Sequence, residues 1–183
     1  MRPIVVLASI FVCFSAGLAE CTDLDSVKVG GVHVTLGMSR VEVEEGLPPD
    51  MILREARDIV PKGISYYEVH GRKSFLARDD SPRTALAWIT FEDDQVTQVS
   101  RTLRTVEGGT SHDSVGMLVS GIYTVFGHQE MPLIIEAGSH SFEGGTFEYF
   151  EARAGHKRVI LRSSPGVTQI TEELGRRDIP VTR

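Results

Sequence analysis

Cysteine, asparagine and long apolar runs are scarce in this sequence. It holds two cysteines, of which Cys13 lies in an apolar N-terminal segment that we expect to be removed. Cys21 is then the only thiol of the mature chain, which excludes an internal disulfide and makes stability depend on a hydrophobic core. Asparagine is absent, so there is no N-glycosylation site. No segment after Cys21 is long and uncharged enough to cross a bilayer as a helix.

The N-terminal residues indicate a cleavable signal peptide over 1–19. Arg2 supplies a positive n-region, residues 4–16 form an uncharged apolar h-region, and small residues precede the expected cleavage after Ala19. We therefore expect an exported protein, periplasmic or secreted. A buried N-terminal strand or helix is the alternative.

Cys21 stands where a bacterial lipoprotein carries its lipidated cysteine. Leu18 and Ala19 fit a lipobox, whereas Glu20 occupies a position that normally holds Gly, Ala or Ser. The expectation is a free, unlipidated protein. The alternatives are an outer-membrane lipoprotein anchored at Cys21 and a cross-link between two copies.

The charge balance argues against nucleic acid as a partner. The formal net charge is −6, from 19 basic and 25 acidic residues. Both signs are interspersed, and no Lys/Arg cluster forms a stripe that could follow a phosphate backbone. A negative surface also disfavours adsorption on anionic lipid. The hydrophobic share of 41% is typical of a globular chain.

The residue patterns predict an α+β protein of two tandem units, each a helix packed on a three-stranded antiparallel meander. Capping-box spacing of Ser39 and Glu42 predicts a short first helix that ends at Gly46. Apolar residues at helical spacing from Asp113 to Gly127 predict the second helix. Segments rich in β-branched and aromatic residues predict a hairpin over 27–34 and strands over 64–70, 85–92, 95–104, 146–153, 157–163 and 167–174.

Three ordered matches between the two halves indicate an internal duplication. The matched pairs are 96–100 with 167–171, 52–56 with 133–137, and 63–68 with 145–151. Features common to any two β-meanders are the alternative explanation. The expected organisation is a signal peptide (1–19), a first unit (20–107), a second unit (108–175) and a tail (176–183).

Several motifs of the first unit form a recognisable series. They are residues 36–43, Leu47-Pro48, Tyr66-Tyr67 and 89–96. The series resembles the SmpA/OmlA type of small outer-membrane lipoproteins, which serve in β-barrel assembly, although the helix stop is permuted and the turn glycine is missing. A tandem of such units also resembles the β-lactamase-inhibitor-protein family, in which two meanders form a concave sheet that grips an enzyme. The first resemblance implies an envelope accessory, and the second implies a secreted enzyme inhibitor.

Catalytic signatures are missing from the sequence. It contains no G-x-S-x-G elbow, no H-E-x-x-H, no Walker loop and no C-x-x-C. The six histidines are dispersed, so we expect neither a metal nor another cofactor; a zinc site at His128 and His140 is the alternative. We therefore expect a non-enzymatic domain that binds another protein. A small exported enzyme without a recognisable motif is the remaining alternative.

An open sheet face would offer aromatic side chains as anchors for a protein partner. The long hairpin from His70 to Thr84 could insert its loop at 78–82 into that partner, and a flexible turn is the alternative. The candidate residues are Trp88, Tyr66, Tyr67, Tyr149, Asp79 and Asp80. Trp88 is the strongest, because Ile89 and Phe91 already supply the opposite face of its strand. For each aromatic residue, burial in the core is the alternative.

Overall fold

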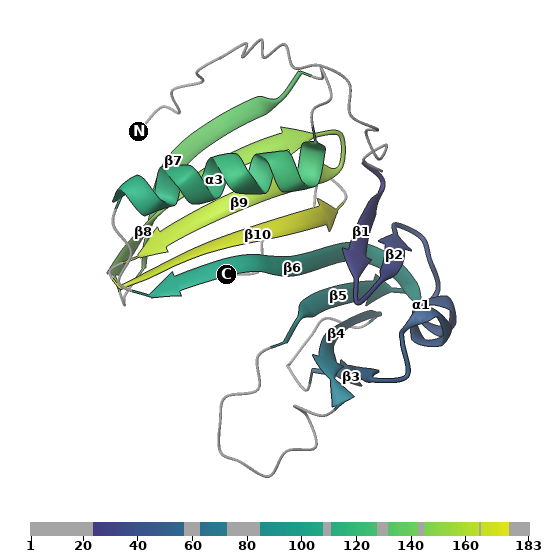
Figure 1. Ribbon diagram of the computed structural model, residues 1–183. Helices are drawn as coiled ribbons and strands as arrows, with labels where there is room; N and C mark the ends of the chain where they lie inside the picture. Colours follow the sequence, from purple (N-terminus) through teal and green to yellow (C-terminus); the bar gives the residue numbers. More distant parts are fainter. Residues whose placement is uncertain are drawn as a thin grey trace. The chain divides into compact units, whose positions relative to one another are not determined.

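The computed structural model describes residues 24–56, 63–72, 85–107, 111–127, 132–142, 145–164 and 166–175. These ranges contain ten strands and two helices. The strands form a two-stranded and an eight-stranded antiparallel sheet (Figure 1). The protein is therefore mostly β. The expected α+β class, with two helix-on-meander units, is wrong. The signal peptide, Cys21, Asp79, Asp80 and the tail at 176–183 lie outside the described residues.

Two unexpected strands and one short helix account for this correction. β3 (Met51–Glu55) pairs with β4 (Ile64–Gly71), and β7 (Ile134–Phe142) pairs with β8 (Gly145–Ala154). Each meander therefore has four strands rather than three. The first helix, α1 (Arg40–Gly46), buries only Val43 and has only seven residues, because it ends at a glycine and two prolines follow Leu47. It is too short to cover a sheet alone.

The chain divides into two compact units. We call the first the Trp88 unit; it comprises the described residues from 25 to 101 together with 173–175. The second, the α3 unit, comprises Leu24 and the described residues from 102 to 172. The strands β6 (Gln95–Glu107) and β10 (Val167–Gly175) each belong partly to both units.

The Trp88 unit has its core on one face of strands β3 to β6. In β5 (Ala87–Glu92), Ala87, Ile89 and Phe91 are fully buried, whereas Trp88 is 38% exposed on the other face. The hairpin of β1 (Ser26–Val29) and β2 (Val32–Thr35) covers the core face together with α1. The buried residues of this cluster are Val27, Val29, Val34, Val43, Tyr67, Val69, Ala87, Ile89, Phe91, Val96, Val99 and Leu174.

The α3 unit is built around the helix α3 (Ser111–Phe126), which lies across β9 (Lys157–Ser164) (Figure 1). The strand order in this unit is β10-β9-β8-β7. Its buried cluster consists of Met117, Val125, Phe126, Ala152, Val159, Leu161 and Ile170. Helix and sheet approach closely at Gly121, as a Cβ placed on this glycine would lie 2.3 Å from Cδ1 of Ile170.

Most of the individual elements expected from the sequence are confirmed. The hairpin, both helices and the six expected strands lie within a few residues of their expected bounds. Asp93 and Asp94 form the turn between β5 and β6, with φ of 50° and 64°, as a two-residue type I′ hairpin turn requires. The internal duplication stays a prediction.

Candidate partner-binding face around Trp88

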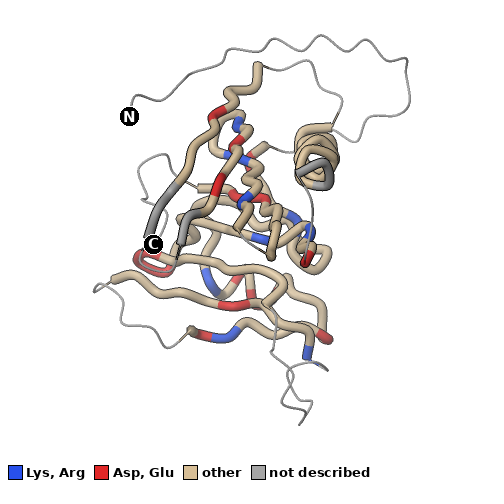
Figure 2. The backbone as a smooth tube through the Cα atoms, turned by 90° about the vertical axis from the view of Figure 1, so that its left-hand side faces the viewer, with Lys and Arg blue, Asp and Glu red and all other residues tan. Residues whose placement is uncertain are grey.

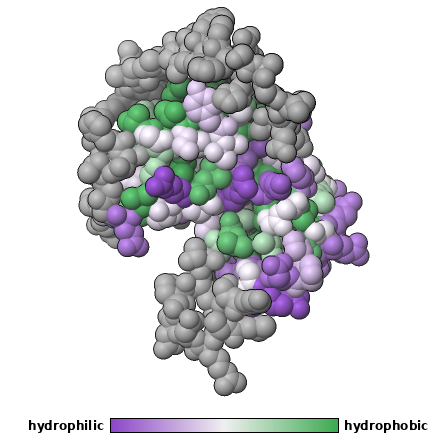
Figure 3. Space-filling view, viewed as in Figure 1, coloured by the Kyte–Doolittle hydropathy of each residue, from purple (hydrophilic) through white to green (hydrophobic). Residues whose placement is uncertain are grey.

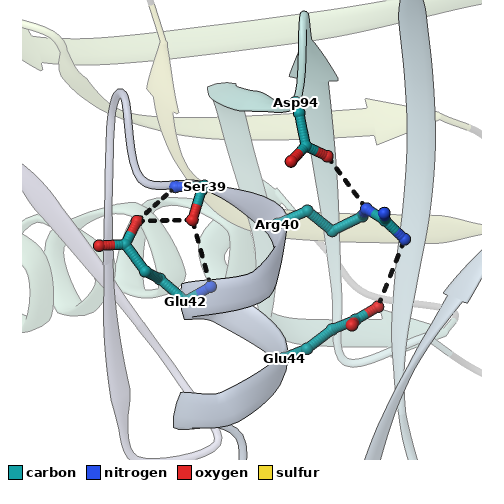
Figure 4. Close-up of polar contacts among 5 residues, drawn as sticks. All are labelled: Ser39, Arg40, Glu42, Glu44 and Asp94. Atoms are coloured by element: carbon teal, nitrogen blue, oxygen red, sulfur yellow. Dashed lines mark hydrogen bonds and ion pairs between the residues drawn. The ribbon is translucent and has the colours of Figure 1, made fainter.

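A capping box fixes the start of α1 (Figure 4). The backbone N–H and the hydroxyl of Ser39 each donate to Oε2 of Glu42 at 2.7 Å, and the Glu42 N–H donates to the Ser39 hydroxyl at 3.3 Å. The box that the spacing predicts is therefore confirmed. The hydrogen bond from the Ser39 side chain, followed by that from its backbone, lowers the pKa of Glu42.

The same helix start is tied to the turn between β5 and β6 (Figure 4). Nε of Arg40 donates to Oδ1 of Asp94 at 3.1 Å, and the Arg40 backbone N–H donates to the Asp94 carbonyl at the same distance. The bond to Asp94 is the main reason that the pKa of Arg40 is raised. The guanidinium carbon also lies 5.9 Å from the centre of the Tyr67 ring. These contacts hold the end of β5, the strand that carries Trp88.

Trp88 lies on the face of β5 opposite the core. The strand register places it directly between Glu68 on β4 and Ser100 on β6, and Arg54 on β3 stands opposite Glu68. Tyr66 pairs with Thr90, so it is a diagonal neighbour of Trp88 on the same face. Leu86, two residues before Trp88, is 46% exposed. We call this surface the Trp88 face; its members are Arg54, Tyr66, Glu68, Leu86, Trp88 and Ser100.

A carboxylate and an imidazole meet beside Trp88. Nε2 of His70 lies 2.8 Å from Oε2 of Glu68, two residues away on the same strand. The His70 side chain is 3% exposed, whereas that of Glu68 is 31% exposed. Because the imidazole is buried, a substrate could not reach it directly. His70 is instead suited to orient the carboxylate of Glu68 at the surface. This pair is not among the residues expected from the sequence, although the spacing of two along a strand places both residues on one face.

The other candidate residues lie elsewhere. Tyr67 is in the core, with its ring at 5.3 Å and nearly perpendicular to that of Phe91. Tyr149 belongs to the α3 unit and packs over Gly138, since a Cβ on that glycine would lie 2.7 Å from the tyrosine ring and hydroxyl. Of the four aromatic candidates, the structure therefore brings Trp88 and Tyr66 to one face.

Charged residues of both signs are interspersed along the chain (Figure 2). In the α3 unit, Arg153 pairs with Glu136 at 3.0 Å, and Arg158 lies 3.8 Å from Glu151. On α3, exposed apolar side chains alternate with small polar ones, and the view in Figure 3 shows hydrophobic and hydrophilic residues mixed on this side.

No metal-binding group of three or more His, Cys, Asp or Glu occurs among the described residues. Within those residues, no helix has the length and apolarity needed to span a membrane. No protein-family model matches the chain, and neither a curated protein nor a solved structure matches it significantly.

Proposed function

We propose that this chain is an exported, non-enzymatic domain that binds another protein through the Trp88 face and acts as an accessory of the bacterial cell envelope. The observation that carries the proposal is the position of Trp88. A large aromatic side chain is 38% exposed on a strand that is paired on both sides, beside Tyr66 and the exposed Leu86.

The arrangement around Trp88 suits a protein interface. Tryptophan and tyrosine dominate binding hot spots, because they bury much area and lose little conformational entropy. Here the anchor is carried by a strand paired on both sides, so it is held in place before a partner arrives. Glu68 and Ser100 flank it with polar groups, which matches the polar rim of a typical interface.

The polar groups beside Trp88 favour binding over catalysis. A general base must come within hydrogen-bond reach of the proton that it removes. The imidazole of His70 is buried behind the surface and held by Glu68, so it positions the carboxylate rather than facing a substrate. The more accessible Glu68 can accept a hydrogen bond from a partner.

Export and an envelope role have separate support. Export rests on the signal-peptide pattern at 1–19, and the envelope role rests on the resemblance to the SmpA/OmlA type of lipoprotein. Mass spectrometry of the mature N-terminus tests both the cleavage and the state of Cys21. A chain that starts at Glu20 supports the free form, whereas a diacylated Cys21 would show an outer-membrane lipoprotein.

Affinity capture from envelope extracts tests the partner-binding proposal. The mature chain serves as bait beside two variants, Trp88→Ala and the matched control Phe150→Ala, whose side chain is 39% exposed in the α3 unit. We expect barrel-assembly components to be retained by the wild type and by Phe150→Ala and lost with Trp88→Ala. Recovery of a single hydrolase would instead favour an enzyme inhibitor. Capture that is unchanged by Trp88→Ala would contradict the proposed face.

A further inference from the structure

β7 forms one edge of the eight-stranded sheet (Figure 1). It pairs with β8 along one edge, and no described strand pairs with its other edge. The unpaired edge of a strand presents a row of backbone N–H and C=O groups that can pair with another chain. Natural proteins normally protect such edges with lysines, prolines, bulges or very short strands.

β7 has none of these protections. It is nine residues long, which corresponds to about 30 Å. Its sequence contains no proline, lysine or arginine, and its one carboxylate, Glu136, is held by Arg153 of the neighbouring strand at 3.0 Å. The pairing with β8 continues without a bulge from Ile134 to Phe142. The edge is therefore long and regular.

The opposite edge strand of the same sheet, β3, is protected. It has five residues, two of which, Arg54 and Glu55, are charged and exposed. Two prolines precede it within the preceding turn. The edge strand β3 thus carries the usual protections and the edge strand β7 lacks them, so the unprotected edge is a specific feature of β7.

A glycine in the middle of β7 is compensated from within the unit. Gly138 stands directly opposite Tyr149, whose ring covers the space that a side chain would fill. An aromatic residue across from a strand glycine restores packing that the glycine lacks. This contact gives Tyr149 a structural role and supports β7 as an ordered strand.

We propose that β7 pairs with β7 of a second copy of this chain, antiparallel, about a two-fold axis at Gly138. Most positions of the strand are matched about this glycine, and the exception is Ile135, which stands opposite Ser141. Small residues, Ala137 and Ser139, stand opposite each other, position 136 (Glu) stands opposite position 140 (His), and position 134 (Ile) stands opposite position 142 (Phe). A two-fold axis requires such a self-complementary surface, and this match is the reason to name a second copy rather than an unrelated strand.

Pairing of one strand per copy buries less than the roughly 800 Å² per partner of a standard interface. The dimer should therefore be concentration-dependent. Sedimentation equilibrium of the mature chain measures the fractions of monomer and dimer directly. We expect a monomer–dimer equilibrium that is shifted to monomer by the double variant Ala137→Lys/Ser139→Lys, whose two sites are exposed.

The matched control places the same two charges away from the edge. Thr105 on β6 and Ser120 on α3 are also exposed, so Thr105→Lys/Ser120→Lys should dimerise like the wild type. A wild type that is monomeric at its highest soluble concentration overturns the proposal. A dimer that survives the edge lysines, or that is lost equally in the control, overturns it as well.

Disulfide trapping tests the register. In a Cys21→Ser background, the proposed axis places Ala137 of one copy opposite Ser139 of the other. Mixing the Ala137→Cys and Ser139→Cys variants should therefore give more cross-linked dimer than either variant alone. More cross-linking by each variant alone would overturn the axis. Dimerisation should also be unaffected by Trp88→Ala, so failure of this inference and failure of the partner-binding proposal are distinguishable.

Discussion

Lys157 and Glu172 form an ion pair inside the α3 unit, with Nζ and Oε1 3.1 Å apart. Their side chains are only 5% and 2% exposed. They lie on β9 and β10, on the side that also carries Val159 and Ile170 of the buried cluster. Two charges removed from water in this way are stable only together, because each alone keeps its desolvation penalty.

Replacing Lys157 by Met should therefore destabilise the protein strongly. The buried carboxylate of Glu172 loses its lysine, and breaking a buried pair costs about 3–5 kcal/mol. The double variant Lys157→Met/Glu172→Met should lose much less than the sum of the two single variants, because no charge is left behind. Urea unfolding of all four proteins gives the coupling energy. Additive losses would show that the two side chains act independently.

The sequence predicts local features of this protein better than its long-range pairings. The capping box of Ser39 and Glu42 depends on residues three apart, and the alternation around Trp88 depends on one strand. Both could be foreseen. The pairing of Lys157 with Glu172 depends on which strands become neighbours and in which register, and no local pattern contains that information.

The edge strands show the same limit. Residues 51–55 and 134–142 are short segments in which a few apolar residues are followed by polar ones, and periodicity alone assigns them to neither strand nor helix. They become β3 and β7 only because a neighbouring strand is free to pair with them. The aromatic candidates divide in a similar way. Adjacent residues of a strand point to opposite faces, so Tyr66 lies on the Trp88 face and Tyr67 in the core.

Removing the cap of α1 should lower the stability of the protein moderately. Ser39→Ala loses the hydrogen bond to the Glu42 N–H and should cost about 1 kcal/mol, whereas Ser39→Gly should cost only a few tenths. Thermal unfolding of the two variants and the wild type measures the difference. Equal losses for alanine and glycine would show that the hydroxyl contributes through another contact.

The carboxylate of Glu42 should make this contribution pH-dependent. Its folded-state pKa is lowered by the hydrogen bonds from Ser39, so its contribution is fully present above the unfolded value of about 4.3 and is lost as the pH falls through the folded value. The stability difference between the wild type and Glu42→Gln should therefore narrow between neutral pH and about pH 3. A difference that is constant over this range would contradict the role of the ionised carboxylate.

Two glycines of α3 should respond oppositely to alanine. At Gly116, an added Cβ would meet no atom within 4 Å outside its own stretch of helix, so Gly116→Ala should stabilise the helix by about 0.5–1 kcal/mol. At Gly121, the added Cβ would lie 2.3 Å from Ile170 and 3.2 Å from Val159, both of which are buried. Overpacking costs about 1–3 kcal/mol and outweighs the helical gain. Gly121→Ala should thus lower the free energy of unfolding, and a stabilised variant would show that α3 can move away from the sheet.

Trp88 and Ile89 are adjacent in β5 and should differ sharply in what they contribute to stability. Ile89 is fully buried in the core, so Ile89→Ala should cost about 2–5 kcal/mol. Trp88 lies on the opposite, partly exposed face, and Trp88→Ala should cost about 1 kcal/mol or less, since substitutions away from the core have small effects. Urea unfolding of both variants compares the two losses of free energy of unfolding within one strand. If Trp88→Ala destabilised as much as Ile89→Ala, its indole would be part of the packing of the unit, and a loss of partner capture in that variant would report unfolding rather than binding.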